Sequence, residues 1–179
     1  MLLKQITLGM TLCLLFSSSF SQTCNTSITA STPDSRFTPQ GNGTVLDTQT
    51  NLIWKRCSEG QVWDGSTGNC TGSASTYNWQ GALDAAQTLN SSGGFASHTD
   101  WRVPNIKELA SIVELKCYDP AINLTIFPNT SSNAFVWSSS PIANFGSKVW
   151  PFYFGYGYYG GNTYLKSDVK QVRLVRSGQ

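Results

Sequence analysis

The ten residues Asp100-Trp101-Arg102-Val103-Pro104-Asn105-Ile106-Lys107-Glu108-Leu109, in the middle of the chain, contain the clearest helix start in the sequence. Asn105 is a favourable N-cap residue, and Glu108 follows three positions later, close to a capping box. One apolar stripe then recurs at helical spacing: Ile106, Leu109, Ala110 and Val113. We expect a helix after Pro104 that ends before Asp119-Pro120, because the residue preceding a proline is disfavoured in the helical region.

Two further elements are predicted on the N-terminal side of this stretch. An apolar stripe at helical spacing predicts a first helix, which the run Asn90-Ser91-Ser92-Gly93-Gly94 ends. The stripe consists of Trp79, Ala82, Leu83, Ala86 and Leu89. Before it, residues 43–47 and 52–56 are rich in β-branched and aromatic side chains and flank a polar turn at 48–51. This pattern predicts a β-hairpin.

On the C-terminal side the pattern changes to strands and turns. Strands are expected at residues 135–137, 149–154 and 171–176, and Pro151 makes the middle one an edge strand or a bulge. Alternation along that strand assigns Trp150, Phe152 and Phe154 to one face, the core face. Two helices between a leading hairpin and trailing strands indicate an α+β domain built from two helices and antiparallel strands or hairpins.

The first 21 residues are typical of a secretory signal peptide. They carry one charge, Lys4, then an 11-residue apolar run at 6–16 and the small-residue end Ser17-Ser18-Ser19-Phe20-Ser21. Because a membrane-spanning helix needs roughly 20 apolar residues, the run is too short to span. We therefore expect cleavage near Ser21, a polar N-terminal lead-in at 22–35, one domain at 36–179 and no transmembrane segment.

Cleavage would also remove Cys13 and leave four cysteines, Cys24, Cys57, Cys70 and Cys117. An even number of cysteines in an exported chain predicts two disulfides, and three connectivities are possible. Lipidation of Cys24 is the alternative at the N-terminus. It is disfavoured because Ser21-Gln22-Thr23 lacks the aliphatic residue normally found three positions before a lipidated cysteine.

Charge is sparse, at 12% of residues. Without Lys4, eleven basic residues face ten acidic ones, so the mature net charge is near zero and no nucleic-acid partner is expected. Residues 120–179 hold five basic residues and a single acid, Asp168, which gives this third a mild attraction for anions. Solvated lysines on strands are an equally good interpretation of that excess.

Few residues could carry chemistry. The single histidine, His98, lies in the loop Ser97-His98-Thr99-Asp100, and the acids are scattered without the spacing of metal ligands or an acid/base pair. Asp100-Trp101-Arg102 reads as a turn aspartate, a core tryptophan and an internally paired arginine. We expect no catalytic residue, no metal site and no cofactor.

Aromatic residues are concentrated near the C-terminus, where residues 145–164 hold nine of the 22 in the chain. The Gly-rich segment 155–162 predicts a flexible, exposed loop rather than a strand or helix. Tyrosine among Gly, Ser and Asn is typical of recognition surfaces, because rigid amphipathic rings give contact area at low entropic cost. The alternative is a loop folded back over its own strands. The candidate ligand contacts are Trp137, Lys148, Tyr156, Tyr158, Tyr159, Tyr164 and Lys166.

Several of these stretches together resemble the Lcl C-terminal domain family, which occurs in exported bacterial proteins. The resemblance runs from about Arg36 to Gln179. It rests on Gly43-Thr44-Val45, Leu52-Ile53-Trp54, Cys57 with Gly60-Gln61 and Trp63, residues 100–109, Pro120-Ala121-Ile122-Asn123, Val136-Trp137-Ser138-Ser139 and the closing Val172-Arg173-Leu174-Val175-Arg176.

The resemblance implies a compact α+β domain distantly related to the C-type-lectin-like and formylglycine-generating-enzyme folds. It also implies disulfides Cys57–Cys70 and Cys24–Cys117. The namesake domain belongs to a collagen-like adhesin that binds sulfated glycosaminoglycans, and this chain lacks a Gly-x-y region. Some relatives are variable proteins of diversity-generating retroelements, whose variable stretch lies where this chain has its Tyr-rich segment.

Taken together, these patterns favour a non-enzymatic, exported ligand-binding or adhesion module. We expect it to bind an extracellular glycan, a sulfated glycan or a protein surface, and to be secreted, periplasmic or displayed on the cell surface. Two alternatives remain: an enzyme related to the formylglycine-generating fold that uses a cysteine pair, and a structural envelope protein.

Overall fold

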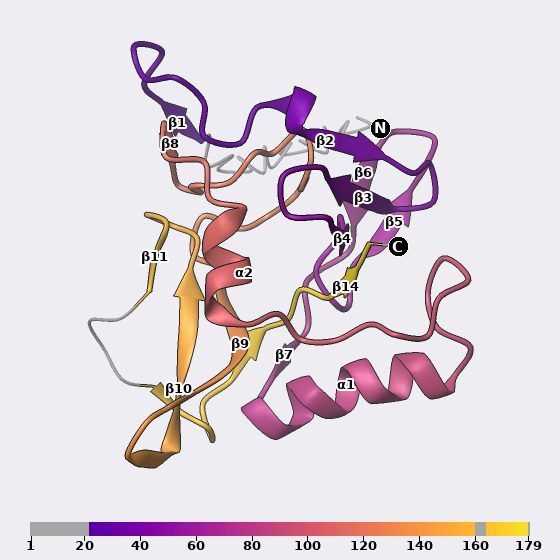
Figure 1. Cartoon of the computed structure of the whole chain (residues 1–179), viewed down its shortest axis with the longest axis vertical. Coiled ribbons are helices and arrows are strands. Elements are labelled where there is room, and N and C mark those ends of the chain that lie inside the picture. The colour runs from indigo at the N-terminus through magenta and orange to yellow at the C-terminus, as the bar shows by residue number, and fades with distance from the viewer. Residues whose placement is uncertain (1–21, 160–163, 179) are drawn as a thin grey trace, which may run out of the picture.

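Two helices and two larger β-sheets form most of the protein in the computed structural model, which describes residues 22–159 and 164–178 (Figure 1). The arrangement is α+β, as the sequence predicts. The predicted signal peptide, including Cys13, lies outside the described residues.

The larger sheet has the strand order β11-β10-β9-β13-β7, with β12 also paired to β10. Every pairing is antiparallel except that of β13 with β9. Its strands are β7 (Thr76–Tyr77), β9 (Phe135–Ile142), β10 (Phe145–Tyr153), β11 (Tyr158–Tyr159), β12 (Tyr164–Leu165) and β13 (Lys170–Gln171).

The second sheet has the order β14-β4-β3-β2 and contains the predicted hairpin. Its strands are β2 (Phe37–Pro39), β3 (Thr44–Asp47), β4 (Leu52–Lys55) and β14 (Val175–Ser177). A 3-10 turn at Asp34–Arg36 precedes β2. Two small ribbons complete the described fold: β1 (Thr23–Cys24) with β8 (Cys117–Tyr118), and β5 (Val62–Asp64) with β6 (Asn69–Thr71).

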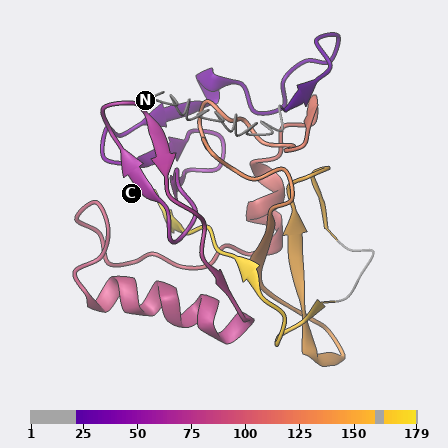
Figure 2. The same cartoon turned by 180° about the vertical axis from the view of Figure 1, so that it is seen from behind.

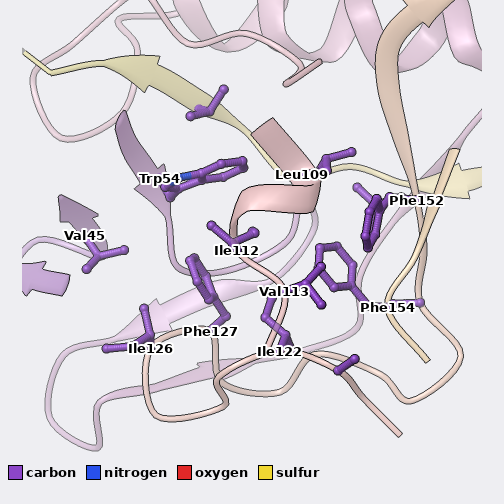
Figure 3. Close-up of a cluster of buried hydrophobic side chains, with 14 of the residues drawn as sticks. Val45, Trp54, Leu109, Ile112, Val113, Ile122, Ile126, Phe127, Phe152 and Phe154 are labelled. Atoms are coloured by element: carbon purple, nitrogen blue, oxygen red, sulfur yellow. The ribbon is translucent and has the colours of Figure 1, made fainter. Parts of the chain in front are cut away.

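Helix α2 (Ile106–Ser111) lies between the two larger sheets and fills the main core. Figure 3 shows Leu109 and Ile112 between Trp54 of β4 and Phe152 of β10, all of them buried. The predicted capping box of Asn105 and Glu108 is confirmed. The helix ends earlier than predicted, however, and Val113 lies beyond it.

This early end has a structural cause. The chain after Ser111 pairs with the segment around Ile122, through a bridge between Val113 and Ile122 and a hydrogen bond from Glu114 N to Ala121 O. The backbone groups that would continue the helix are therefore used in pairing with the segment that follows β8. Val113 still joins the apolar cluster, but from an extended segment.

Helix α1 (Trp79–Ser91) covers a second apolar cluster and is capped by Asn78, whose side chain accepts a hydrogen bond from Gly81 N. Ala82 and Ala86 are buried against Trp101, Trp137 and Val149. Figure 2 shows α1 at the opposite end of the molecule from the β1–β8 ribbon.

Strand β10 corrects part of the prediction for residues 149–154. It lies inside the sheet rather than at its edge, and its pairing with β9 is irregular between Val149 and Pro151, so the predicted bulge is confirmed. Phe152 and Phe154 are buried as expected, but Trp150 is only half buried. Phe152 belongs to the core cluster with Leu109 of α2, whereas the ring of Trp150 lies 6.3 Å from that of the exposed Tyr159.

The predicted terminal strand at 171–176 is divided between the two sheets. Gln171 pairs with Val136 in the larger sheet, whereas Val175 pairs with Trp54 in the smaller one. The connecting residues Val172, Arg173 and Leu174 are buried. The apolar residues of a short segment that crosses between two sheets follow the same pattern as those of one continuous strand. The sequence pattern therefore predicted a single strand.

Both predicted disulfides are present, and the pairing implied by the family resemblance is the one found. Cys57–Cys70 closes the β5–β6 ribbon with a sequence separation of 13, a loop for which the chain-entropy model gives about 3 kcal/mol. Cys24–Cys117 joins β1 to β8 over a separation of 93. It fixes the N-terminal segment beside the edge of the larger sheet.

Candidate functional site

A continuous row of aromatic rings extends from β8 across one face of the larger sheet. We call it the aromatic ladder; its members are Tyr118, Tyr156, Tyr153, Tyr158, Phe135 and Tyr164. Neighbouring ring centroids are 6.2 Å apart for Tyr118 and Tyr156, 5.8 Å for Tyr156 and Tyr153, and 5.5 Å for Tyr153 and Tyr158. The row continues from Tyr153 to Phe135 at 4.3 Å, and from Phe135 to Tyr164 at 5.2 Å.

Strand register explains the centre of the ladder. Tyr153 of β10 pairs directly with Phe135 of β9 on one side and with Tyr158 of β11 on the other. Directly opposed residues of adjacent strands point to the same face, so the three rings form a cross-strand row. Residues 154–157 form the turn between β10 and β11, and Tyr156 extends the row from that turn.

Tyr118 joins the ladder from a different part of the chain. It follows the disulfide-bonded Cys117 in β8, and the next residue, Asp119, donates its N–H to Gly155 O at 2.7 Å. Ala121 N donates to Phe154 O at 2.6 Å. Two backbone hydrogen bonds and a disulfide therefore hold Tyr118 against the β10–β11 turn, where its ring stacks on Tyr156 at an interplanar angle of 23°.

The outer end of the ladder faces solvent. Tyr118, Tyr156 and Tyr158 are 45%, 61% and 48% exposed, while Tyr153, Phe135 and Tyr164 are half buried beneath or beside them. The exposure of Tyr156, Tyr158 and Tyr159 predicted from the sequence is thus confirmed. Loops folded back over their own strands, the alternative interpretation, would have covered these rings.

The surroundings of Tyr153, at the centre of the ladder, favour its neutral phenol. Burial raises the pKa of Tyr153, and the nearby Asp119, Tyr156, Tyr158 and Tyr164 raise it further. A neutral phenol both donates and accepts a hydrogen bond. The ladder therefore offers ring faces together with hydroxyl groups that can donate or accept a hydrogen bond.

Lys170 lies at the far end of the ladder. Its ammonium is 4.5 Å from the ring centroid of Tyr164 and 5.6 Å from that of Phe135, which are cation–π distances. Sequence reasoning did not select Lys170, Tyr118, Tyr153 or Phe135. Alternation in β10 could have placed Tyr153 opposite the core residues Phe152 and Phe154, but no local pattern identifies Tyr118 or Lys170.

Tyr159 is separated from the other predicted contacts. It is 54% exposed but pairs with Phe152, so it points to the opposite face from Tyr158, and its ring lies 6.3 Å from Trp150. The segment is also more regular than predicted, because Tyr158 and Tyr159 form β11 rather than a flexible loop. The expected loop residues 160–162 lie outside the described residues.

The remaining predicted contacts do not join the ladder surface. Trp137 is fully buried and donates its indole N–H to Tyr77 O at 2.7 Å, so as a direct ligand contact it is excluded, and the prediction for it is wrong. It packs in the core because α1 covers this part of the sheet. Lys148 lies 4.9 Å from the Phe145 ring and Lys166 lies 4.4 Å from the Trp79 ring, both outside the ladder.

The Asp100-Trp101-Arg102 motif has the structural role that the sequence suggests. Trp101 is buried, Arg102 forms two hydrogen bonds with Glu108, and Asp100 accepts from Arg176 at 2.7 Å. Within residues 22–159 and 164–178, no group of His, Cys, Asp and Glu side chains has the arrangement of a metal site. The aromatic ladder is therefore the candidate site.

Comparison with known families gives one match. Residues 43–176 match the family described as Lcl C-terminal domain, in agreement with the resemblance seen in the sequence. A search of curated proteins found no match. Neither α1 nor α2, the α-helices in the described part of the chain, is long and apolar enough to cross a membrane.

Proposed function

The chain belongs to the Lcl C-terminal domain family, and from that premise we propose that it is an exported binding module that holds an extracellular glycan against the aromatic ladder. The observation that carries the proposal is the contact of Tyr118, Tyr156, Tyr153 and Tyr158 in one row whose outer rings are exposed. Contiguous exposed apolar patches on a protein surface mark interaction sites or ligand-binding grooves.

Ring geometry supports a glycan as the ligand. A sugar ring presents flat patches of C–H groups and a rim of hydroxyls, so it can stack on a tyrosine face and exchange hydrogen bonds with the phenol group. The ladder offers this combination at five tyrosines, with centroid spacings of 5.5–6.2 Å along Tyr118, Tyr156, Tyr153 and Tyr158. Several consecutive sugar units could therefore contact it.

The scaffold supports binding at low entropic cost. Tyr118 is held by the Cys24–Cys117 disulfide and by the hydrogen bond from Asp119 N to Gly155 O, and Tyr153 and Tyr158 lie in paired strands. Rings that are already ordered lose little conformational freedom when a ligand binds. This pre-organisation favours a binding role.

Export is part of the proposal. The N-terminal sequence is typical of a signal peptide, and both disulfides suit an oxidising compartment. We propose that residues 1–21 are removed and that the domain acts in the periplasm, on the cell surface or in the medium. Mass spectrometry of the secreted protein should give an N-terminus near Gln22; retention of residues 1–21 would contradict export by this route.

A glycan array tests the binding role. The wild-type protein should bind a defined group of glycans, and a Tyr156→Ala/Tyr158→Ala variant should lose that signal. Phe145→Ala is a matched control, since Phe145 is 52% exposed on the same sheet but outside the ladder. Equal glycan binding by all three proteins would exclude the ladder. Binding of none of them to any glycan would direct the search to a protein ligand instead.

A further inference from the structure

A hollow lies away from the ladder, between the segment after β6 and the turn that precedes β9. It has a volume of about 510 Å³, and the residues that line it are mostly hydroxyl- and amide-bearing. They include Gln61, Ser73, Asn129, Ser131, Ser132 and Gln171. None of them belongs to the ladder, so an inference about this hollow stands apart from the proposed function.

Thr130 connects the hollow to the interior. It lines the hollow but is only 7% exposed, and its hydroxyl donates to Phe127 O at 2.8 Å. The same Oγ1 accepts a hydrogen bond from Nη2 of Arg173 at 3.0 Å. The guanidinium of Arg173 thus lies directly behind one wall of the hollow.

Arg173 is a buried cation without a counterion in the described part of the chain. It is 1% exposed, and its Nη1 donates to the carbonyl oxygens of Lys55 and Arg56. The described ion pairs all involve other cations, and Nε of Arg173 has no hydrogen-bond partner. A buried charge that only neutral groups solvate is costly, and a nearby anion would stabilise it.

The guanidinium nevertheless keeps its charge at neutral pH. Burial lowers the pKa of Arg173 to about 10, which is still well above 7. The protein interior screens charge weakly, so the positive potential of Arg173 extends past Thr130 into the hollow. A group with a single negative charge would balance it.

Donors for such a group are available on the surface of the hollow. The hydroxyls of Ser73 and Ser132 and the side-chain amide of Gln171 belong to residues that line it. Neutral hydroxyl and amide groups of this kind recognise both carboxylate oxygens and the hydroxyls of a polar small molecule.

From this geometry we propose that the hollow beside Thr130 binds a small hydroxylated carboxylic acid, such as a sugar acid, whose carboxylate lies on the Arg173 side and whose oxygens are bound by the hydroxyl and amide groups of Ser73, Ser132 and Gln171. The carboxylate supplies the one negative charge that Arg173 lacks. The polar lining and the volume suit a single monosaccharide unit better than an extended apolar ligand.

Thermal unfolding of the full chain, with galacturonate as the probe at constant ionic strength, tests this site. Galacturonate should raise the melting temperature in a concentration-dependent manner, whereas galactose, chloride and sulfate at matched concentration should have little effect. An equal rise with every anion would show a general salt effect and overturn the proposal, and so would the absence of any rise with galacturonate.

Two aspartate variants make the test specific. Ser132→Asp places a tethered carboxylate in the hollow, so this variant should melt at a higher temperature than wild type and bind galacturonate at least tenfold more weakly. Ser167→Asp adds the same charge at an exposed position in the turn after β12 and should retain the wild-type response. An unchanged galacturonate response in Ser132→Asp would contradict the site. Because the ladder is intact in both variants, the outcome does not depend on the glycan proposal.

Discussion

The ring of Tyr118 stacks on the ring of Tyr156, with centroids 6.2 Å apart and planes inclined by 23°. The two residues belong to different parts of the fold, β8 and the turn after β10, and the Cys24–Cys117 disulfide holds the first of them in place. This contact extends the row of exposed rings beyond the Tyr-rich segment. The candidate site therefore depends on residues from two separated regions of the sequence.

Tyr118→Ala should weaken glycan binding about as much as Tyr156→Ala does, because each change removes an exposed ring from the same row. Loss of an aromatic contact with the ligand is expected to cost about 1 kcal/mol of binding free energy, roughly fivefold in Kd. Calorimetric titration with a glycan selected on the array measures the change. Leu115→Ala, at a residue that is 70% exposed nearby, is the control and should bind like wild type.

Cys24→Ser/Cys117→Ser should lower both stability and binding. The disulfide closes a loop with a sequence separation of 93, so the chain-entropy model gives a loss of about 4–5 kcal/mol. Urea unfolding measures the stability, and titration under native conditions measures the loss caused by a less ordered Tyr118. If the double variant unfolds at low urea yet keeps full affinity while folded, the disulfide does not position the ring.

Asn105→Ala should destabilise the domain by about 1 kcal/mol, because Asn105 caps α2 and its side chain accepts from Glu108 N at 2.9 Å. Urea unfolding reports the change. Asn105→Asp keeps an accepting oxygen and should remain close to wild type. A similar loss in both variants would show that the cap hydrogen bond is not the cause.

Stability should fall in acid, in part through Glu114. Burial alone would raise the pKa of Glu114, but hydrogen bonds from Thr32, Lys116 and Ser31 outweigh it and hold the pKa below its usual value of 4.5. A lowered pKa in the folded state contributes stability that is present above pH 4.5 and is lost as the pH falls through the folded-state value. Glu114→Gln should be less stable at pH 7 and should lose less stability between pH 5 and pH 2 than wild type. An identical acid dependence of the unfolding free energy in both proteins would contradict this role.

The cysteine pairs provide a test that separates binding from redox chemistry. All four cysteines of the described chain form disulfides, so the native protein should show no reaction with a thiol reagent until it is denatured and reduced. Mass spectrometry after alkylation measures this directly. A freely alkylated pair in the native protein would favour the enzymatic alternative.

Local signals predicted much of the fold. The N-cap at Asn105, the apolar stripe of the first helix and the hairpin at 43–56 all appear where the sequence places them. Errors occur where pairing with another segment decides the outcome: the chain after Ser111 pairs with residues near Ile122, and the terminal apolar run crosses from β13 to β14. Local periodicity contains no information on such partners.

The site was predicted in part for the same reason. Composition identified Tyr156 and Tyr158 as exposed, because a Gly-rich aromatic segment cannot bury every ring. It could not separate Tyr158 from Tyr159, which the register with β10 sends to opposite faces, or exclude Trp137, which α1 covers. Tyr118 and Lys170 join the ladder only through tertiary structure.

The comparison of Tyr158→Ala with Tyr159→Ala tests the central claim most directly, since the two tyrosines are adjacent, similarly exposed and on opposite faces of β11. Titration of an array-selected glycan into each variant gives the Kd. The ladder predicts a Kd about tenfold weaker for Tyr158→Ala, equivalent to about 1.4 kcal/mol, and a change below about twofold for Tyr159→Ala. Equal losses in the two variants, or a larger loss for Tyr159→Ala, would contradict the account.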